Sequence, residues 1–253
     1  MSNFPFPKEH GAYVVLIAAW LLGIIFAPCL DMIGVVLTFS LSVSLFLLQG
    51  PLRKFLRYRN AKKNTFDLPT LILSAIGILS GLLLGIHSPH SILLAIPLLP
   101  IAFLYLLFLK KRSTPTQLSL IGFTGLSLAV PLVMLSSNCT VSIGILFSVW
   151  LFATLFFCSS VFCVEVRLSG KPAIGRALLY HFGALGIVVG CVVLGKLPYT
   201  AIIVMSIALA RILLISIYHE VYRKLPLKYI GILESIVALL GVLTSAVPSI
   251  FYS

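Results

Sequence analysis

Long apolar runs separated by short polar segments fill almost the whole chain. An α-helix needs about 20 mostly apolar residues to cross a hydrocarbon core about 30 Å thick. No ten-residue segment alternates apolar and polar residues as a membrane β-strand does. We therefore predict nine transmembrane helices, over residues 11–29, 33–50, 68–86, 91–109, 117–136, 140–163, 177–195, 199–218 and 230–251.

The composition agrees with this pattern. Of the 253 residues, 60% are hydrophobic and only 9% are charged, and the mean hydropathy is +1.16. Soluble domains carry about 25% charged residues, and a chain of this length in water buries only about three quarters of its surface. These values exclude a soluble protein and predict a single all-α transmembrane domain over residues 1–253.

The basic residues are distributed unevenly between the spans. The chain has 18 Lys and Arg against 6 Asp and Glu, a net charge of +12. All the basic residues except Lys196 and Arg211 fall in the N-terminal arm or after the second, fourth, sixth and eighth spans. Basic loops stay in the cytoplasm, which predicts a cytoplasmic N-terminus and an external C-terminus. The lipid bilayer is then the expected partner, because anionic headgroups attract such loops, and no nucleic acid is required.

The cysteines and histidines give little sign of a metal site. The five cysteines lie in apolar stretches without a CxxC pair, which favours small core residues. A bridge between Cys29 and Cys139 stays open, because both lie near span ends on the same predicted side. His87 and His90 flank a turn with no third ligand, so we expect them to be solvated. His181 is expected to be hydrogen-bonded rather than catalytic.

Arg211 and Glu234 are charged residues that lie inside predicted spans, Arg211 about seven residues from the predicted cytoplasmic end of the eighth and Glu234 about four residues into the ninth. Burying a charge in a membrane is costly, so such residues suggest function. The eighth and ninth spans are antiparallel and joined by a short connection, so the two side chains are expected to be able to meet. Three interpretations stay open: a structural ion pair, a ligand-binding role, and an Arg211 side chain that extends to the interface.

The N-terminal segment Pro7–Ala12 places an acid and an imidazole at the start of the first span. Glu9 suits the positive end of the helix dipole and is interpreted first as a cap. His10 titrates near neutral pH, which makes it a candidate base.

Two basic segments lie on the predicted cytoplasmic side. Arg53 and Arg57 are four residues apart and so share one helical face, a spacing suited to gripping a phosphate. Plain positive-inside topology is the alternative explanation. Glu165, Arg167 and Lys171 follow the sixth span, and we expect both segments to form one cationic cup at the cytoplasmic mouth of the bundle.

The residues PKEHGA, the Arg-rich segment after the second span, Arg211 and the segment Lys228–Glu234 resemble the YwiC-like family of bacterial membrane proteins. The resemblance implies a multi-pass protein of the bacterial cytoplasmic membrane. It brings no assigned reaction.

The predicted topology is also similar to that of the UbiA-type intramembrane prenyltransferases, which have nine helices and active-site loops after the second and sixth. The segment Glu165–Pro172 resembles the acid-x-x-x-Gly-Lys segment of those enzymes. UbiA-type enzymes hold Mg²⁺ against a prenyl diphosphate with two aspartate-rich motifs, whereas this chain has Arg53, Lys54 and Arg57 at the first and keeps only Glu165 at the second. Because Mg²⁺ prefers carboxylate oxygens, we predict no metal-ligating residues, and Mg²⁺ is only a candidate cofactor.

These observations lead to one functional hypothesis and two alternatives. We expect the cytoplasmic side to bind a prenyl diphosphate or another anionic lipid, with phosphate neutralised by Arg53, Arg57, Arg167 and Lys171. Glu9, Arg211 and Glu234 are expected to line or brace the pocket, and His10 and Glu165 are the candidate catalytic bases. The alternatives are a transporter or permease and a non-catalytic subunit of a membrane enzyme. The sequence indicates no particular protein partner.

Overall fold

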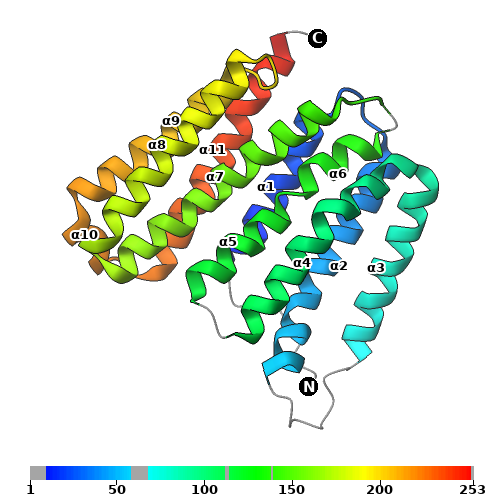
Figure 1. Ribbon diagram of the computed structural model, residues 1–253, viewed down its shortest axis with the longest axis horizontal. Helices are drawn as coiled ribbons and strands as arrows, with labels where there is room; N and C mark the ends of the chain where they lie inside the picture. The colour runs from blue at the N-terminus through cyan, green and yellow to red at the C-terminus, as the bar shows by residue number, and fades with distance from the viewer. Residues whose placement is uncertain (1–9, 58–67, 112–113, 138, 252–253) are drawn as a thin grey trace.

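The computed structural model describes residues 10–57, 68–111, 114–137 and 139–251, and within these ranges every regular element is a helix (Figure 1). On one side of the molecule lie α2 (Met32–Arg57), α3 (Leu68–His87) and α4 (Ala95–Lys110), the last preceded by the 3₁₀ helix η1 (Pro89–Leu94). In the middle lie α1 (His10–Phe26), α5 (Pro115–Leu126) and α6 (Ala129–Ser136). The other side holds α7 (Ile143–Ser169), α8 (Lys171–Val193), α9 (Thr200–Ile217), α10 (His219–Lys224) and α11 (Leu227–Phe251).

The middle helices join the two sides into one bundle. α1 packs on α6 and on α11, while α7 contacts α5, α6, α8, α9 and α11. Small residues allow the closest approaches. A Cβ at Gly23 of α1 would lie 2.7 Å from the Val133 Cβ of α6, so only glycine permits this contact. The largest core cluster accordingly combines residues of α1, α6, α7, α9 and α11.

The chain is a multi-pass membrane protein. In its described ranges, eight helical segments are long and apolar enough to cross a membrane, and Ala12–Phe26 is a shorter apolar helix. Two of the eight combine neighbouring elements, η1 with α4 over Pro89–Lys110 and α5 with α6 over Thr116–Ser136. α1 has 17 helical residues, below the about 20 needed to span a hydrocarbon core. The ninth span and the orientation of the termini therefore stay predictions.

The fifth predicted span, 117–136, is confirmed as an apolar segment long enough to cross a membrane, Thr116–Ser136, but it is not one regular helix. It consists of α5 and α6, separated by a turn at Ser127 and Leu128. Pro131 has no N–H, so it cannot donate to the Ser127 carbonyl as a regular helix requires. The N–H of Val130 donates to that carbonyl instead, at 3.1 Å, which tightens the chain locally.

The predicted loop between the sixth and seventh spans is also wrong. α7 continues to Ser169 and α8 begins at Lys171, so only Gly170 separates them. The φ of Gly170 is +72°, a conformation that glycine adopts without steric cost. Charged residues end an apolar run without ending a helix, and Glu165 and Arg167 therefore lie on the last turns of α7.

At the end of the bundle where α1 meets α2, Cys29 and Cys139 form a disulfide with their Cα atoms 6.4 Å apart. The core-residue interpretation is therefore wrong for these two cysteines, and it is confirmed for the buried Cys158 and Cys163. The two cysteines are 110 residues apart in the sequence, so their spacing along the chain could not predict that they meet.

The same end holds a polar contact that the sequence pattern did not indicate. His87 Nε2 lies 2.5 Å from Asp31 Oδ2, and both side chains are about three-quarters buried. The expectation of a solvated His87 is therefore wrong, because the turns after α1 and α3 pack together. His181 forms the expected hydrogen bond, from Nδ1 to the Ala177 carbonyl oxygen at 2.7 Å.

Candidate functional site

A cavity of about 440 Å³, called the large cavity below, lies between α2, α3, α4 and the α5–α6 pair, with Leu16 of α1 at its back. This volume is within the range of about 300–1,000 Å³ typical of ligand sites. Its walls are mainly leucine, isoleucine, alanine and glycine. Leu45, Leu98 and Leu106 line it while also being exposed on the surface of the bundle. The cavity therefore opens sideways, between α2 and α4, onto the surface that faces lipid.

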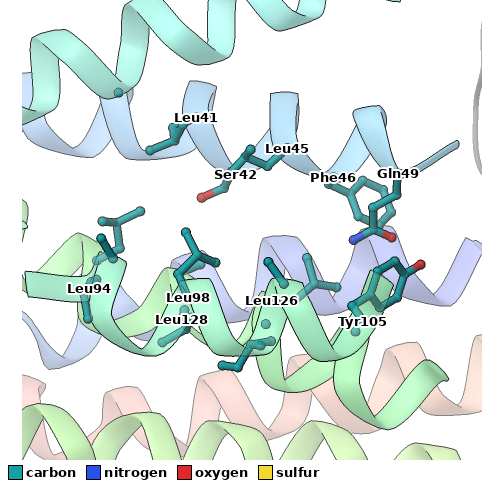
Figure 2. A pocket seen from close by; sticks show the side chains of 18 of the residues that line it. Leu41, Ser42, Leu45, Phe46, Gln49, Leu94, Leu98, Tyr105, Leu126 and Leu128 are labelled. Carbon is teal, nitrogen blue, oxygen red and sulfur yellow. The ribbon is translucent and has the colours of Figure 1, made fainter. Parts of the chain in front are cut away.

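Polar groups interrupt this apolar wall at a few points (Figure 2). Gln49 of α2 and Tyr105 of α4 lie opposite each other at one end, and the Ser42 hydroxyl points into the cavity from α2. An apolar cavity with few polar groups at one end fits an amphipathic molecule, whose chain fills the cavity and whose polar head lies at that end.

The Gln49 end continues toward the basic part of α2. Four residues, about one helical turn, separate Gln49 from Arg53, and α2 remains helical to Arg57. The predicted helical spacing of Arg53 and Arg57 is therefore confirmed for the backbone. Their side chains lie outside the described residues.

A second polar site is buried among α7, α9 and α11. Arg211 of α9 forms an ion pair through Nη1 with Oε2 of Glu234 on α11, as their placement in adjacent spans predicted. Arg211 Nη2 also donates to the Ser159 hydroxyl of α7 at 3.0 Å. The exposed fractions of the two charged residues are 7% and 8%, so Arg211 does not extend to the interface. Whether the pair also binds substrate stays a prediction.

A smaller cavity, of about 240 Å³, lies beside this ion pair between α1, α5, α7 and α11. Glu165 and Glu234 both line it. Glu165 is paired at its outer side with Arg176 of α8, at 2.7 Å between Oε1 and Nη2. The structure thus brings together two of the predicted acids, far from Arg53 and Arg57.

The two basic segments do not come together in the described part of the chain. Arg167 donates from Nε and Nη2 to the Leu225 carbonyl oxygen, at 3.4 and 3.3 Å, and so fixes the connection between α10 and α11. Lys171 begins α8, which packs on α7 and α9, whereas α2 packs on α3, α6 and α4. Figure 1 shows the ends of α2 and of α7 at opposite sides of the bundle.

Glu9 and His10 are two further predicted residues whose side chains the structure does not describe. Glu9 lies outside the described residues. His10 is the first residue of α1, and only its backbone is described. Their predicted roles stay untested.

Sequence reasoning missed the residues that line the large cavity. Gln49 and Tyr105 lie near the ends of predicted spans, where polar residues are ordinary, and an apolar lining has the same composition as the rest of the spans. The described residues contain no group of three or more His, Cys, Asp or Glu side chains placed to hold a metal ion.

A family model described as YwiC-like protein matches residues 6–134. The chain belongs to the YwiC-like family. Neither the search of curated proteins nor the search of solved structures finds a match. In this YwiC-like protein, the matched segment contains every residue that lines the large cavity, from Leu16 to Leu132. The Arg211–Glu234 pair lies beyond the matched segment.

Proposed function

We propose that this YwiC-like protein binds a prenyl diphosphate or another anionic isoprenoid lipid in the large cavity. The observation that carries the proposal is the combination of an apolar cavity, open sideways between α2 and α4, with a polar end that leads to the basic segment of α2. The lipid chain would lie along Leu45, Leu98 and Leu126. Gln49 and Tyr105 would contact the head, and Arg53 and Arg57 would neutralise its phosphates.

The proposal includes nine spans in a bacterial cytoplasmic membrane, with the N-terminus inside and the C-terminus outside. The distribution of charge supports this orientation, because the ends of α4 and α10 carry Lys110, Lys111, Arg223 and Lys224. The disulfide supports it independently. Disulfides form and persist in oxidising compartments, and Cys29–Cys139 lies at the opposite end of the bundle.

A transferase reaction of UbiA-like type belongs to the same proposal. The reaction would need the diphosphate to leave, and Mg²⁺ is the candidate that would assist it. Among the described acids, Glu165 is directed to the smaller cavity rather than to the large one. This placement favours binding of phosphate by arginine over binding through a metal held by the protein.

The test is binding of geranylgeranyl diphosphate to the detergent-purified protein, with Mg²⁺ and with EDTA. We expect saturable binding that weakens at least tenfold in the double variant Arg53→Gln/Arg57→Gln. Binding that needs Mg²⁺ would support the metal-assisted transferase, and binding in EDTA would support direct contact by arginine. No binding in either buffer would overturn the proposal.

A filling variant tests the cavity itself. A Cβ added at Gly122 would meet only the ring of Tyr105, at 3.9 Å, so Gly122→Leu should occupy the cavity without distorting the helices. The matched control is Gly186→Leu on α8, where an added Cβ meets nothing within 4 Å and which lines neither cavity. We expect Gly122→Leu to lose lipid binding and the control to keep it.

A transporter is the second candidate, and the break between α5 and α6 favours it. Discontinuous helices near substrate sites are typical of secondary transporters, and Leu126, Leu128 and Ala129 around this break line the large cavity. Uptake of a labelled solute into proteoliposomes, abolished by Gly122→Leu, would support transport over lipid binding alone.

A further inference from the structure

The smaller cavity is a separate site from the proposed lipid cavity. Both contact α1 and α5, but from opposite sides. Leu16 and Ile121 line the large cavity, whereas Val14, Val15 and Ser119 line the small one. α1 and α5 thus form a wall between the two cavities.

The small cavity has an unusual distribution of charge for the interior of a basic protein. Its lining contains two carboxylates, Glu165 and Glu234, and no Lys, Arg or His. Hydroxyls of Thr116, Ser119 and Ser160 add neutral polar groups, and the remaining wall is mainly apolar. Each carboxylate is paired with an arginine outside the lining, Glu165 with Arg176 and Glu234 with Arg211, so the lining itself offers acceptor oxygens and no basic side chain. It suits a molecule with a positive, hydrogen-bond-donating head and a short apolar body.

Glu234 supplies the strongest sign of a ligand. Its Oε2 is paired with Arg211, but its Oε1 is buried and has no hydrogen-bond partner among the described residues. The residue is only 8% exposed. A buried carboxylate oxygen without a donor is costly, and a donor group on a molecule in the cavity would remove this cost.

The second carboxylate lies at the outer part of the same cavity. The Glu165 side chain is 12% exposed and its partner Arg176 is 63% exposed. Ion pairs with so exposed a partner are weak, so Glu165 remains available to a second donor at the mouth.

We propose that the small cavity binds a short-chain alkylamine in its protonated form. The ammonium group would donate to Glu234 Oε1, and the alkyl chain would contact Val14, Phe123 and Ile230. A charge-assisted hydrogen bond to a buried carboxylate is stronger than a bond between neutral groups. This inference goes beyond the proposed lipid function and does not depend on it.

The test uses the detergent-purified full chain, titrated calorimetrically with butylammonium chloride at pH 7.5. We expect saturable binding at one site. The isosteric controls are 1-butanol, which lacks the charge, and butyrate, which reverses it, and both should bind at least tenfold more weakly.

Three variants separate binding in this cavity from a structural effect. Gly231 lines the cavity and an added Cβ meets nothing within 4 Å, so Gly231→Leu should fill the space and abolish amine binding. Gly186→Leu is the matched control and should bind as the unmodified protein does. Glu165→Gln removes the second carboxylate of the lining, at the mouth of the cavity, and should weaken amine binding less than Gly231→Leu does.

Three results would overturn the inference: no saturable binding, equal binding of 1-butanol, or unchanged amine binding in Gly231→Leu. Equal binding of 1-butanol would mean that the cavity binds small molecules without recognising the positive charge. Lipid binding measured in Gly231→Leu keeps the two proposals apart, since it should be unchanged there.

Discussion

Arg211 and Glu234 are charged residues that lie deep in the described part of the bundle, and their energetics follow from that burial. Desolvation of two charges is expensive, and their mutual attraction recovers it only while both are present. The Ser159 hydroxyl adds one more contact to the guanidinium. The pair is therefore expected to hold α9 against α11 as long as neither partner is removed alone.

We predict that Arg211→Met or Glu234→Leu alone lowers the free energy of unfolding by about 3–5 kcal/mol, because each leaves a buried charge unpaired. The double variant should recover most of that loss, to within about 1 kcal/mol of the unmodified protein, since no charge is then buried. Denaturant titration in detergent micelles measures all four proteins. A double variant as unstable as the worse single variant would contradict this account.

Asp31 lies in the turn between α1 and α2 and forms hydrogen bonds with residues of α2 and α3. Its Oδ1 accepts the N–H of Ile33 at 3.0 Å at the start of α2, and its Oδ2 meets His87 at the end of α3. The hydrogen bond with His87 lowers the pKa of Asp31 below its ordinary value. A carboxyl whose pKa is lower in the folded state stabilises that state above its ordinary pKa.

We therefore predict that Asp31→Asn is less stable than the unmodified protein at pH 7. The difference should shrink as the pH falls below about 4, the ordinary Asp value, and be lost as the pH passes through the lowered pKa of folded Asp31. Asparagine keeps an oxygen for the Ile33 contact, so the variant tests mainly the charge. Thermal unfolding between pH 7 and pH 3 measures the difference. Glu220→Gln is the control. Glu220 also contacts a histidine, His219, at 2.9 Å, but its side chain is 66% exposed, where an ion pair contributes little, so this variant should show little pH-dependent change. A constant difference across this pH range would show that the charge is not the cause.

At the scale of the helices, packing depends on where glycine faces a neighbour. Gly34 of α2 lies against Ser136 of α6, where an added Cβ would lie 2.9 Å from the Ser136 Cβ and closer still to its carbonyl oxygen. Gly186 of α8 has open space around the same position. Two glycines of similar sequence context thus have different structural roles.

We predict opposite effects for alanine at these two positions. Gly34→Ala must move α6 and should destabilise the protein by about 1–3 kcal/mol, the usual cost of overpacking. Gly186→Ala should be neutral or stabilising by up to about 1 kcal/mol, because alanine favours the helix. Thermal unfolding of both variants in the same detergent compares them directly. Equal destabilisation would mean that glycine acts through helix flexibility and not through helix contacts.

At the scale of the whole molecule, the two ends of the bundle differ in chemistry. One end carries the disulfide and the Asp31–His87 contact, and the other carries most of the described basic residues. The large cavity has its Gln49–Tyr105 end toward the basic side. This asymmetry is what a membrane with an oxidising exterior and an anionic inner surface favours.

We predict that the protein purified from membranes, denatured without reductant, shows three alkylated thiols by mass spectrometry, and five after reduction. The chain has five cysteines, of which Cys158, Cys163 and Cys191 are free. Cys139→Ser should show four in both conditions. Five thiols without reduction would contradict the disulfide and remove its support for the orientation.

The sequence by itself determined the membrane class and, within a few residues, most of the helices, because hydropathy and charge act locally along the chain. It also predicted that Arg211 and Glu234 meet, since adjacent antiparallel helices with a short connection bring such positions together. The sequence did not predict the break at Ser127, nor that the helix continues past Glu165 and Arg167. Both depend on backbone hydrogen bonds, which hydropathy does not measure.

Only the tertiary structure decided which helices are neighbours. In lipid, apolar surface gains little by choosing one helix over another, so neighbours are selected by the shapes of small and large side chains and by interhelical hydrogen bonds. That selection separated Arg53 and Arg57 from Arg167 and Lys171, although all were predicted to lie at one mouth. It also placed Glu165 beside Glu234 in one cavity. Neither result can be obtained from spacing along the chain, because both depend on how α1 and α5 divide the bundle.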